Sequence, residues 1–265
     1  MKKLVFFAVV LAAVGFAACG NKNVQNTEVQ DSVKSFEQEQ IEASIKMHFD
    51  SLAAELSKLK ELPLMAKDGA VVLTAAEKKV KPDFLLNPSI ADEATTLAEK
   101  YRALTALQTD KQIAKIYEMA TDDYDKAIAK LAADIDDPSF KALEEGANLT
   151  DNAEALYNAM NENGRINYFW QIAATSLVEQ LYATSQNSDK FVKAFNDEAA
   201  SNSTFRLVLI LDAIDRLKEF DPEIAPVAEA LKPLEVLNAM TVDEMKTQLN
   251  EAKDKIAEAR KAILK

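Results

Sequence analysis

The last 25 residues, "TVDEMKTQLNEAKDKIAEARKAILK" (241–265), decide the fold class. Thr241 is followed three residues later by Glu244, the capping box that begins many helices. Apolar side chains then recur every three or four positions, the period of an α-helix with one apolar seam: Val242, Met245, Leu249, Ala252, Ile256, Ala259 and Ile263. The stretch therefore predicts a helix that runs to the end of the chain. Two small seam residues, Ala252 and Ala259, would let a neighbouring helix approach closely.

A second seam lies near the start of the chain. A helix is predicted from Asp31 or Ser32 to just before Pro63, because its apolar residues recur at spacings of 4, 3, 4 and 3: Ile45, Phe49, Leu52, Leu56 and Leu59. Both terminal helices thus carry a coiled-coil-like seam. We expect them to pack against each other or along a shared bundle.

Composition extends this prediction to the whole chain. Only five glycines occur in 265 residues, and Ala, Leu, Lys and Glu dominate, which is typical of all-helical proteins. No fixed-period repeat is present. The sequence therefore predicts an all-α, bundle-like fold, in which residues 31–265 form one domain of roughly nine or ten helices.

Turn residues and helix caps divide the interior. Helices are expected from Asn87-Pro88 or Ser89 to about Gln108, from a cap at Asp110 or Thr121 to Ile135, from Asp137-Pro138 over a short stretch, from a cap at Thr150 to Asn163-Gly164, from Ile166 to Ser185, and from Asp189 to Glu198. Prolines at positions 222, 226 and 233 should break the following part into short helices.

Two segments call for a more specific expectation. Ser203 should cap a helix over 204–220, and its run from Leu207 to Leu211 is apolar on every side, which predicts the buried central helix. The segment 62–89 is interrupted by prolines and a glycine, yet rich in apolar residues, so it should be irregular and packed over the core. Within it, residues 74–77 suggest a helical turn, and a minor β-hairpin around Val71 is the alternative.

The first eighteen residues have the layout of a secretory signal. Lys2 and Lys3 precede an uncharged apolar run, and small residues precede Cys19. The run of about 15 residues is short for a spanning helix, which needs about 20. We therefore expect residues 1–18 to be cleaved and residues 19–30 to form a flexible tether, with a retained membrane anchor as the alternative.

The cleavage region resembles the lipobox of bacterial lipoproteins: Phe16, Ala17, Ala18 and Cys19, with Phe16 in place of the usual aliphatic residue. The resemblance covers only the leader. It implies that Cys19 becomes the first residue of the mature protein and carries fatty acyl chains such as palmitate. Each buried methylene of such chains contributes about 0.8 kcal/mol, so two or more chains anchor a protein to the membrane lastingly.

The same resemblance suggests a location in the cell envelope. Gly20 stands where lipoproteins kept at the inner membrane of many diderm bacteria carry Asp, so the outer membrane is expected. No acidic cluster follows Cys19, although the lipoproteins that Bacteroidetes export to the cell surface usually have one. By this analogy the domain faces the periplasm.

Charge and cysteine content exclude several classes of function. The chain has a formal net charge of −12, and removal of a leader with two lysines and no acid would make it −14. Such a surface repels phosphate backbones, so nucleic acid is not an expected partner. Cys19 is the only cysteine, and once it carries lipid the mature chain has no thiol for disulfides, thiolate metal sites or cysteine catalysis.

No catalytic or metal-binding constellation is apparent. His48 is the only histidine, and Ile45 and Ser51 stand where a helical metal site would place a carboxylate, so a helix-surface histidine is favoured. Asp134, Asp136 and Glu145 match three positions of a calcium loop, but Asp137-Pro138 reads better as a helix cap. Neither a metal nor a cofactor is predicted.

The most distinctive short stretch is Gly164-Arg-Ile-Asn-Tyr-Phe-Trp170, which opens the longest interior helix and holds the only tryptophan. Arg, Tyr and Trp carry much of the binding energy in interfaces and ligand grooves. Arg165, Tyr168 and Trp170 are therefore the candidate ligand-binding residues. The competing interpretation is packing, because Trp170 lies next to an apolar stripe at helical spacing.

These observations lead to one expectation and two alternatives. We expect a non-enzymatic lipoprotein, anchored to the periplasmic face of the outer membrane, that acts as a binding or scaffolding module for a protein or envelope-glycan partner. The first alternative is an envelope hydrolase or glycan-processing enzyme that uses acidic residues, which should show a pocket with convergent carboxylates of shifted pKa. The second is a carrier of a small apolar ligand, which requires a cavity inside the bundle.

Overall fold

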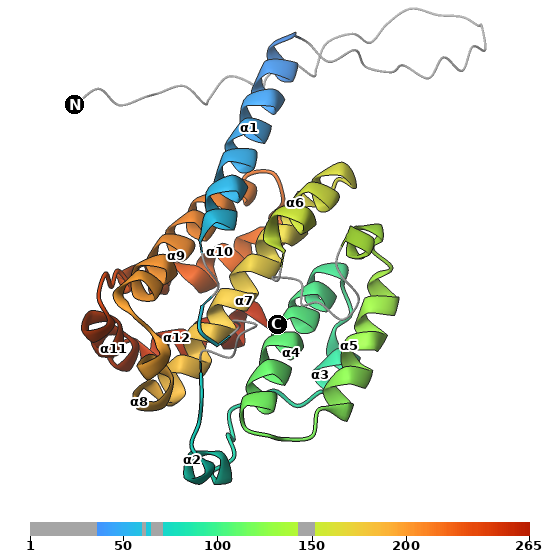
Figure 1. Cartoon of the computed structure of the whole chain (residues 1–265). Helices are drawn as coiled ribbons and strands as arrows, with labels where there is room; N and C mark the ends of the chain where they lie inside the picture. The colour runs from blue at the N-terminus through green and yellow to red at the C-terminus, as the bar shows by residue number, and fades with distance from the viewer. Residues whose placement is uncertain (1–35, 60–61, 65–70, 143–151) are drawn as a thin grey trace, which may run out of the picture. The chain divides into compact units, whose positions relative to one another are not determined.

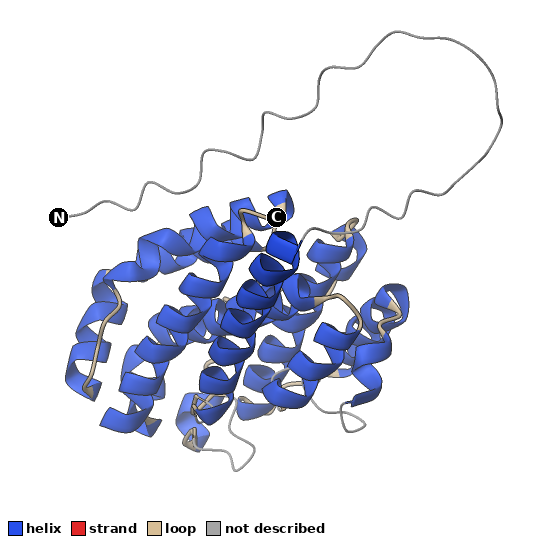
Figure 2. Ribbon diagram, turned by 90° about the horizontal axis from the view of Figure 1, so that it is seen from above, coloured by secondary structure: helices blue, strands red, loops and turns tan. Residues whose placement is uncertain are grey.

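A computed structural model describes residues 36–59, 62–64, 71–142 and 152–265. Within these ranges all regular structure is helical, twelve α-helices and four short 3₁₀ segments (Figure 2), which confirms the all-α class. The number exceeds the expected nine or ten because several of these helices are a single turn long. Internal contacts divide the chain after Glu42, so that the described part of the first unit is only the start of helix α1.

The second unit, Ala43–Lys265, contains the rest of α1 and every other element. In chain order the elements are α1 (Phe36–Lys58), α2 (Ala75–Lys79), α3 (Ile90–Glu93), α4 (Leu97–Ile116), α5 (Asp122–Ile135), η1 (Pro138–Ala142), α6 (Ala153–Glu162), α7 (Ile166–Gln186), α8 (Ser188–Phe191), η2 (Val192–Ala194), α9 (Asp197–Leu217), η3 (Pro222–Ile224), α10 (Ala225–Leu231), η4 (Lys232–Val236), α11 (Val242–Glu251) and α12 (Lys253–Ile263).

Helix α7 is the centre of this unit. It packs against α4, α6, α9 and α12, and Figure 1 shows it running between the α4–α5 pair and α9. Fifteen of its 21 residues are buried, polar ones included. Its predicted extent, residues 166–185, is confirmed to within one residue.

The prediction that residues 204–220 form the buried central helix is wrong. Helix α9 buries one face, and Val208, the second residue of the apolar run, is 55% exposed. A run of five apolar residues covers more than one full turn, but a neighbour is needed on every side to bury it, and the buried residues of α9 fall on one face. The helix also begins earlier than expected, because Asn196 rather than Ser203 provides the N-cap by accepting from the backbone N–H of Ala199.

Another expected helix, from about 88 to 108, is divided in two. The chain leaves helical geometry after α3, and Thr96 restarts it through a capping box with Glu99. Helix α4 then continues through Asp110, so this residue is not a cap. Thr121 does occupy the N-cap position of α5, although its side chain makes no capping hydrogen bond.

The C-terminal stretch forms two helices rather than one. The capping box of Thr241 and Glu244 is confirmed, but the helix is interrupted at Ala252, which lies between α11 and α12. Helix α12 packs on α7 and α10, while the ring of Phe49 on α1 lies 6.4 Å from that of Trp170 on α7. Both terminal helices contribute to one apolar core, as expected for a shared bundle.

The described residues between α1 and α3 are largely irregular, as predicted. A capping box of Thr74 and Glu77 begins the short helix α2, and the described residues from Val71 onward form no strand. Val71, Leu73 and Phe84 are buried in a second apolar cluster with Tyr117 and Phe191. Prolines 222, 226 and 233 lie in or beside the short elements η3, α10 and η4, as expected, and α6 begins with Asn152 as its N-cap, while Thr150 lies outside the described residues.

Candidate functional site

The predictions for the leader, the tether and Cys19 concern residues 1–30, which lie outside the described residues. Within the described part of the chain, no helix combines the length and apolar character needed to cross a bilayer.

Trp170 belongs to the core. Its side chain is 0% exposed, and three aromatic rings surround it: Phe169 with a centroid distance of 5.1 Å, and Phe49 and Tyr157 at 6.4 Å each. The first two of the three predicted ligand-binding residues, Arg165 and Tyr168, lie apart from this aromatic cluster, at the beginning of α7. The packing interpretation thus accounts for Trp170, and a surface groove cannot include it.

Arg165 stands at the N-cap position of α7 and is held by two partners. Its Nη1 donates to the hydroxyl oxygen of Tyr101 at 2.8 Å and lies 3.5 Å from Oδ2 of Asp137. The Tyr101 hydroxyl in turn donates to the Asp137 carboxylate, whose side chain is fully buried. Asp137 also accepts from the backbone N–H of Ser139, which confirms its capping role at η1. The three side chains therefore satisfy one another.

Burial dominates the electrostatics of this group. It raises the pKa of Tyr101 well above its usual value, and the hydrogen bond to Asp137 raises it further. The hydrogen bond with Tyr101 raises the pKa of Arg165 in turn. Tyr168 stacks on the Tyr101 ring, with centroids 4.8 Å apart and planes at 20°. Arg165 and Tyr168 are thus brought together and half-buried, and their binding role remains a prediction.

A cluster of three charged residues, Asp110, Glu179 and Arg260, lies buried where α4, α7 and α12 meet. The Arg260 Nε lies 3.0 and 2.8 Å from the two carboxylate oxygens of Glu179, and Nη2 lies 3.4 Å from Oδ2 of Asp110. We call these residues the buried charge cluster. The structure shows here an ionic group that sequence reasoning missed.

The irregular segment before α3 completes the surroundings of the cluster. Arg260 Nη1 donates to the carbonyl oxygen of Phe84 at 3.1 Å, and the backbone N–H of Leu86 donates to Asp110 at 2.6 Å. The guanidinium lies 4.2 Å from the ring centroid of Tyr182, a cation–π geometry. The cluster therefore ties four parts of the chain together: α4, α7, α12 and residues 84–86.

The carboxyl groups of Asp110 and Glu179 both contact the Arg260 guanidinium, and both are shielded from water. Burial raises the pKa of Glu179 to about 8 and that of Asp110 to about 6, and the neighbouring negative charge of Asp110 raises the pKa of Glu179 as well. Arg260 opposes both shifts. Because the Glu179 and Asp110 side chains are only 1% exposed, no substrate from solvent can reach these carboxyl groups in this structure.

Two signals could have identified the cluster. Glu179 is the only charged residue between Ile166 and Gln186, and an isolated charge within a long uncharged helix calls for a partner. Arg260 adjoins the apolar seam of the C-terminal helix, four residues after Ile256. Nothing in the sequence indicated that these residues meet each other and Asp110, which was predicted as a helix cap.

His48 pairs with a residue distant in sequence. Its Nε2 lies 2.8 Å from Oδ2 of Asp212, which joins α1 to α9, and Asp212 also lies 3.4 Å from Nε of Arg216. Both partners of the histidine pair are partly exposed. Among the described residues no group of three or more His, Cys, Asp or Glu side chains is placed to hold a metal ion.

Large apolar side chains are exposed on helix α9, at the end of η4 and just before α11. Phe205, Val208, Val236 and Met240 are each 47–55% exposed. The Thr204 hydroxyl donates to the carbonyl oxygen of Ala239 at 2.7 Å, so residues next to Thr204 and Ala239 lie close together. We call these four residues the apolar surface patch.

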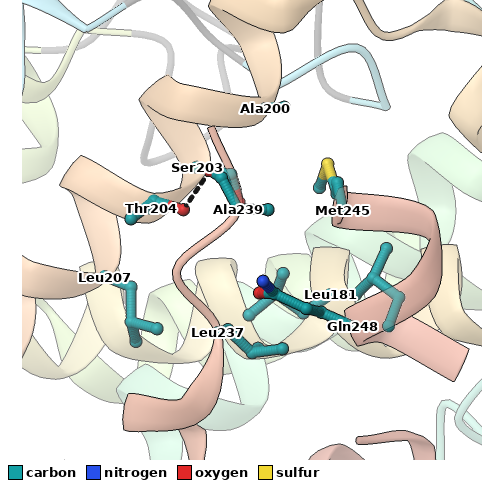
Figure 3. A pocket seen from close by; sticks show the side chains of 10 residues that line it. Leu181, Ala200, Ser203, Thr204, Leu207, Leu237, Ala239, Met245 and Gln248 are labelled. Carbon is teal, nitrogen blue, oxygen red and sulfur yellow. Dashed lines mark hydrogen bonds between the residues drawn. The ribbon is translucent and has the colours of Figure 1, made fainter. Parts of the chain in front are cut away.

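Beneath this region lies a small apolar pocket between α7, α9 and α11. Figure 3 shows its lining side chains, with the Thr204–Ala239 hydrogen bond along one edge. Leu181, Leu207, Leu237 and Leu249 supply much of the lining. The space enclosed is about 20 Å³, enough for one water molecule. An apolar ligand would have to displace the lining to enter.

No protein-family model, no curated protein sequence and no solved structure gives a significant match to this chain.

Proposed function

We propose that this chain is a lipoprotein, anchored through acylated Cys19 to the periplasmic face of the outer membrane, whose helical domain acts as a non-enzymatic binding or scaffolding module. The apolar surface patch on α9 and the η4–α11 connection carries the binding part of the proposal. Exposed large apolar side chains cost solvation free energy, and groups of them often mark sites where another protein binds. The signal-like leader and Cys19 support the anchored part.

The patch favours a protein partner over an envelope glycan. Three of the four side chains, Val208, Val236 and Met240, are aliphatic, whereas sugars are held by hydrogen bonds and by exposed aromatic faces. A partner with an apolar strip of matching size would bury these four side chains. The acidic character of the domain, with a net charge of −12 over the chain, would speed association with a partner of basic surface.

The two alternatives receive less support. Asp110 and Glu179 have the raised pKa values expected of a hydrolase, but their burial keeps them from a substrate. The apolar pocket of about 20 Å³ is too small to hold the ligand of an apolar-ligand carrier. Binding at a surface therefore remains the function that the described residues support best.

One experiment tests the anchor. Cells that express the wild-type chain or Cys19→Ala are grown with labelled palmitate and separated into soluble and membrane fractions. We expect label on the wild-type chain only, and the variant in the soluble fraction or retained as an uncleaved precursor. An unlabelled wild-type chain would refute the lipoprotein assignment.

A second experiment tests the patch. Envelope proteins are cross-linked to the lipidated wild-type chain, to the double variant Phe205→Lys/Val208→Lys, and to Val80→Lys, which changes an exposed apolar residue outside the patch. We expect specific partners that are lost with the double variant and retained with Val80→Lys. An identical set of partners for all three chains would refute binding through the patch. Sedimentation of the purified chain tests whether the partner is a second copy.

A further inference from the structure

The buried charge cluster is unusual in its charge balance. Asp110 and Glu179 would each carry −1 and Arg260 carries +1, so full ionisation leaves an uncompensated negative charge among side chains with little contact to water. An uncompensated charge in a medium of low dielectric constant is costly, and a carboxyl group avoids the cost by keeping its proton. The geometry alone therefore indicates that the folded cluster binds one proton.

The contacts of the two acids differ, which indicates where the proton resides. Asp110 accepts from the backbone N–H of Leu86 at 2.6 Å as well as facing Arg260. Among the described residues, the donor to Glu179 is Arg260, through its Nε. The ionised form of Asp110 is thus better solvated by the protein, and Glu179 is the more strongly protonated partner, in line with its higher pKa.

The other elements around the cluster add few charges. Tyr124 on α5 donates to the Leu86 carbonyl at 2.9 Å, and burial raises its pKa to about 12, so it is a neutral neighbour below strongly alkaline pH. Tyr182 on α7 lies under the guanidinium and contacts it through its ring. Helix α10 packs on α12 with apolar residues such as Leu231, and its Glu229 is exposed. The charge state of the cluster is therefore decided by Asp110, Glu179 and Arg260 themselves.

We propose that the buried charge cluster is a proton-dependent latch: it holds α12 and residues 84–86 on the core while Asp110 and Glu179 share one proton, and it loosens when alkaline pH removes that proton. The attachment depends on Arg260, which is the residue that joins α12 to α4, α7 and the Phe84 carbonyl. When the second carboxylate ionises, water has to enter to solvate it, and the segments that exclude water must move apart. This proposal is independent of the proposed binding function.

Hydrogen exchange of the full chain tests the latch. Protection factors, which are corrected for the intrinsic effect of pH on exchange, are measured by mass spectrometry for the amides of α12 at pH 6 and pH 9. We expect the protection factor of α12 in the wild-type chain to fall about tenfold or more, the change that one unit of pKa represents. Amides of α6, which contributes no residue to the cluster or to its named surroundings, should keep their protection.

Two variants separate the latch from general alkaline sensitivity. Glu179→Gln keeps a neutral group of the same shape, so α12 should remain equally protected at both pH values. Glu258→Gln removes an exposed carboxylate of the same helix and should behave as the wild type. If Glu179→Gln fails to fold, Asp110→Asn takes its place with the same expectation.

The outcomes are distinct. A loss of protection in the wild type that disappears with Glu179→Gln or Asp110→Asn and persists with Glu258→Gln supports the latch. Equal protection of the wild-type α12 at both pH values overturns it, and so does a loss that is the same in the variants that neutralise the cluster. Infrared difference spectra offer an independent check, because a buried carboxylic acid band should vanish between pH 6 and pH 9 in the wild type and be missing in Glu179→Gln.

Discussion

Arg260 on α12 and Glu179 on α7, 81 residues apart in sequence, form an ion pair with an Nε–Oε2 distance of 2.8 Å inside the protein. The pair joins the last helix to the central one. It also places two carboxyl groups beside one guanidinium, because Asp110 contacts the same arginine. Several measurable properties depend on this relationship and on the packing around α7.

Removal of the arginine should destabilise the fold strongly. In Arg260→Leu the two acids lose the cation that they share, and the loss of one member of a buried ionic group typically costs about 3–5 kcal/mol. Urea unfolding monitored by circular dichroism measures the change. Arg216→Leu, which removes an exposed partner of Asp212, is the matched control and should cost less than about 1 kcal/mol. Equal losses for both variants would contradict the importance of the buried pair.

The free energy of unfolding should fall as pH rises from about 4.5 to about 8. In this window the unfolded chain has released the Glu179 proton and the folded chain still holds it, so each step in pH favours the unfolded state. Below it, the capping carboxylates Glu77, Glu99 and Glu244, whose pKa values are lowered by backbone or hydroxyl donors, lose their stabilising charge. Stability should therefore peak near about pH 4.5.

Glu179→Gln provides the check on this pH dependence. Stability curves from urea unfolding between pH 5 and pH 9 should be flatter for this variant than for the wild type, because the amide does not titrate. A wild-type curve that rises with pH through this window would show that Glu179 is ionised in the folded chain.

The hydroxyl group of Tyr101 should contribute more to the stability of the fold than that of Tyr168, its stacking partner. Tyr101→Phe removes a donor to the buried Asp137 carboxylate and an acceptor for Arg165, and a hydrogen bond to a charged group is worth about 1.5–3 kcal/mol. Tyr168→Phe keeps the stacked ring and loses a half-buried hydroxyl, so its cost should stay below about 1 kcal/mol. Thermal unfolding of both variants decides the order, and a larger loss for Tyr168→Phe would contradict it.

The single tryptophan reports on the core directly. Trp170 is enclosed by Phe49, Tyr157 and Phe169, so its fluorescence should be blue-shifted and poorly quenched by acrylamide. The chain unfolded in urea serves as the exposed reference. Emission from the folded chain that matches this reference would place Trp170 at the surface and restore it as a candidate ligand-binding residue.

The capping box of the C-terminal stretch can be tested by itself. Thr241→Ala removes the acceptor for the Glu244 backbone N–H and should cost about 1 kcal/mol. Thr247→Ala, within the same helix and exposed, should be neutral or slightly stabilising because Ala has the higher helix propensity. Chemical unfolding of the two variants separates the cap from a general effect of losing a threonine.

Local interactions explain what could be predicted from the sequence alone. The helical period, the capping boxes of Thr74 and Thr241, the extent of α7 and the effect of the prolines depend on residues within a few positions of one another. Errors arose where two local signals competed. Asn196 rather than Ser203 caps α9. The C-terminal helix is interrupted at Ala252, although the apolar side chains keep their helical spacing across it.

Only the tertiary structure decided which helix is central and which charges meet. An amphipathic pattern shows that one face will be buried, but burial on every side depends on how many neighbours a helix has, so α7 with its polar residues is enclosed while the apolar run of α9 is partly exposed. Asp110, Glu179 and Arg260 gave no joint signal, because their meeting depends on the way α4, α7 and α12 pack together. Helix formation is a short-range property of the chain, and the desolvation that changes the chemistry of a carboxyl group appears only when distant segments exclude water together.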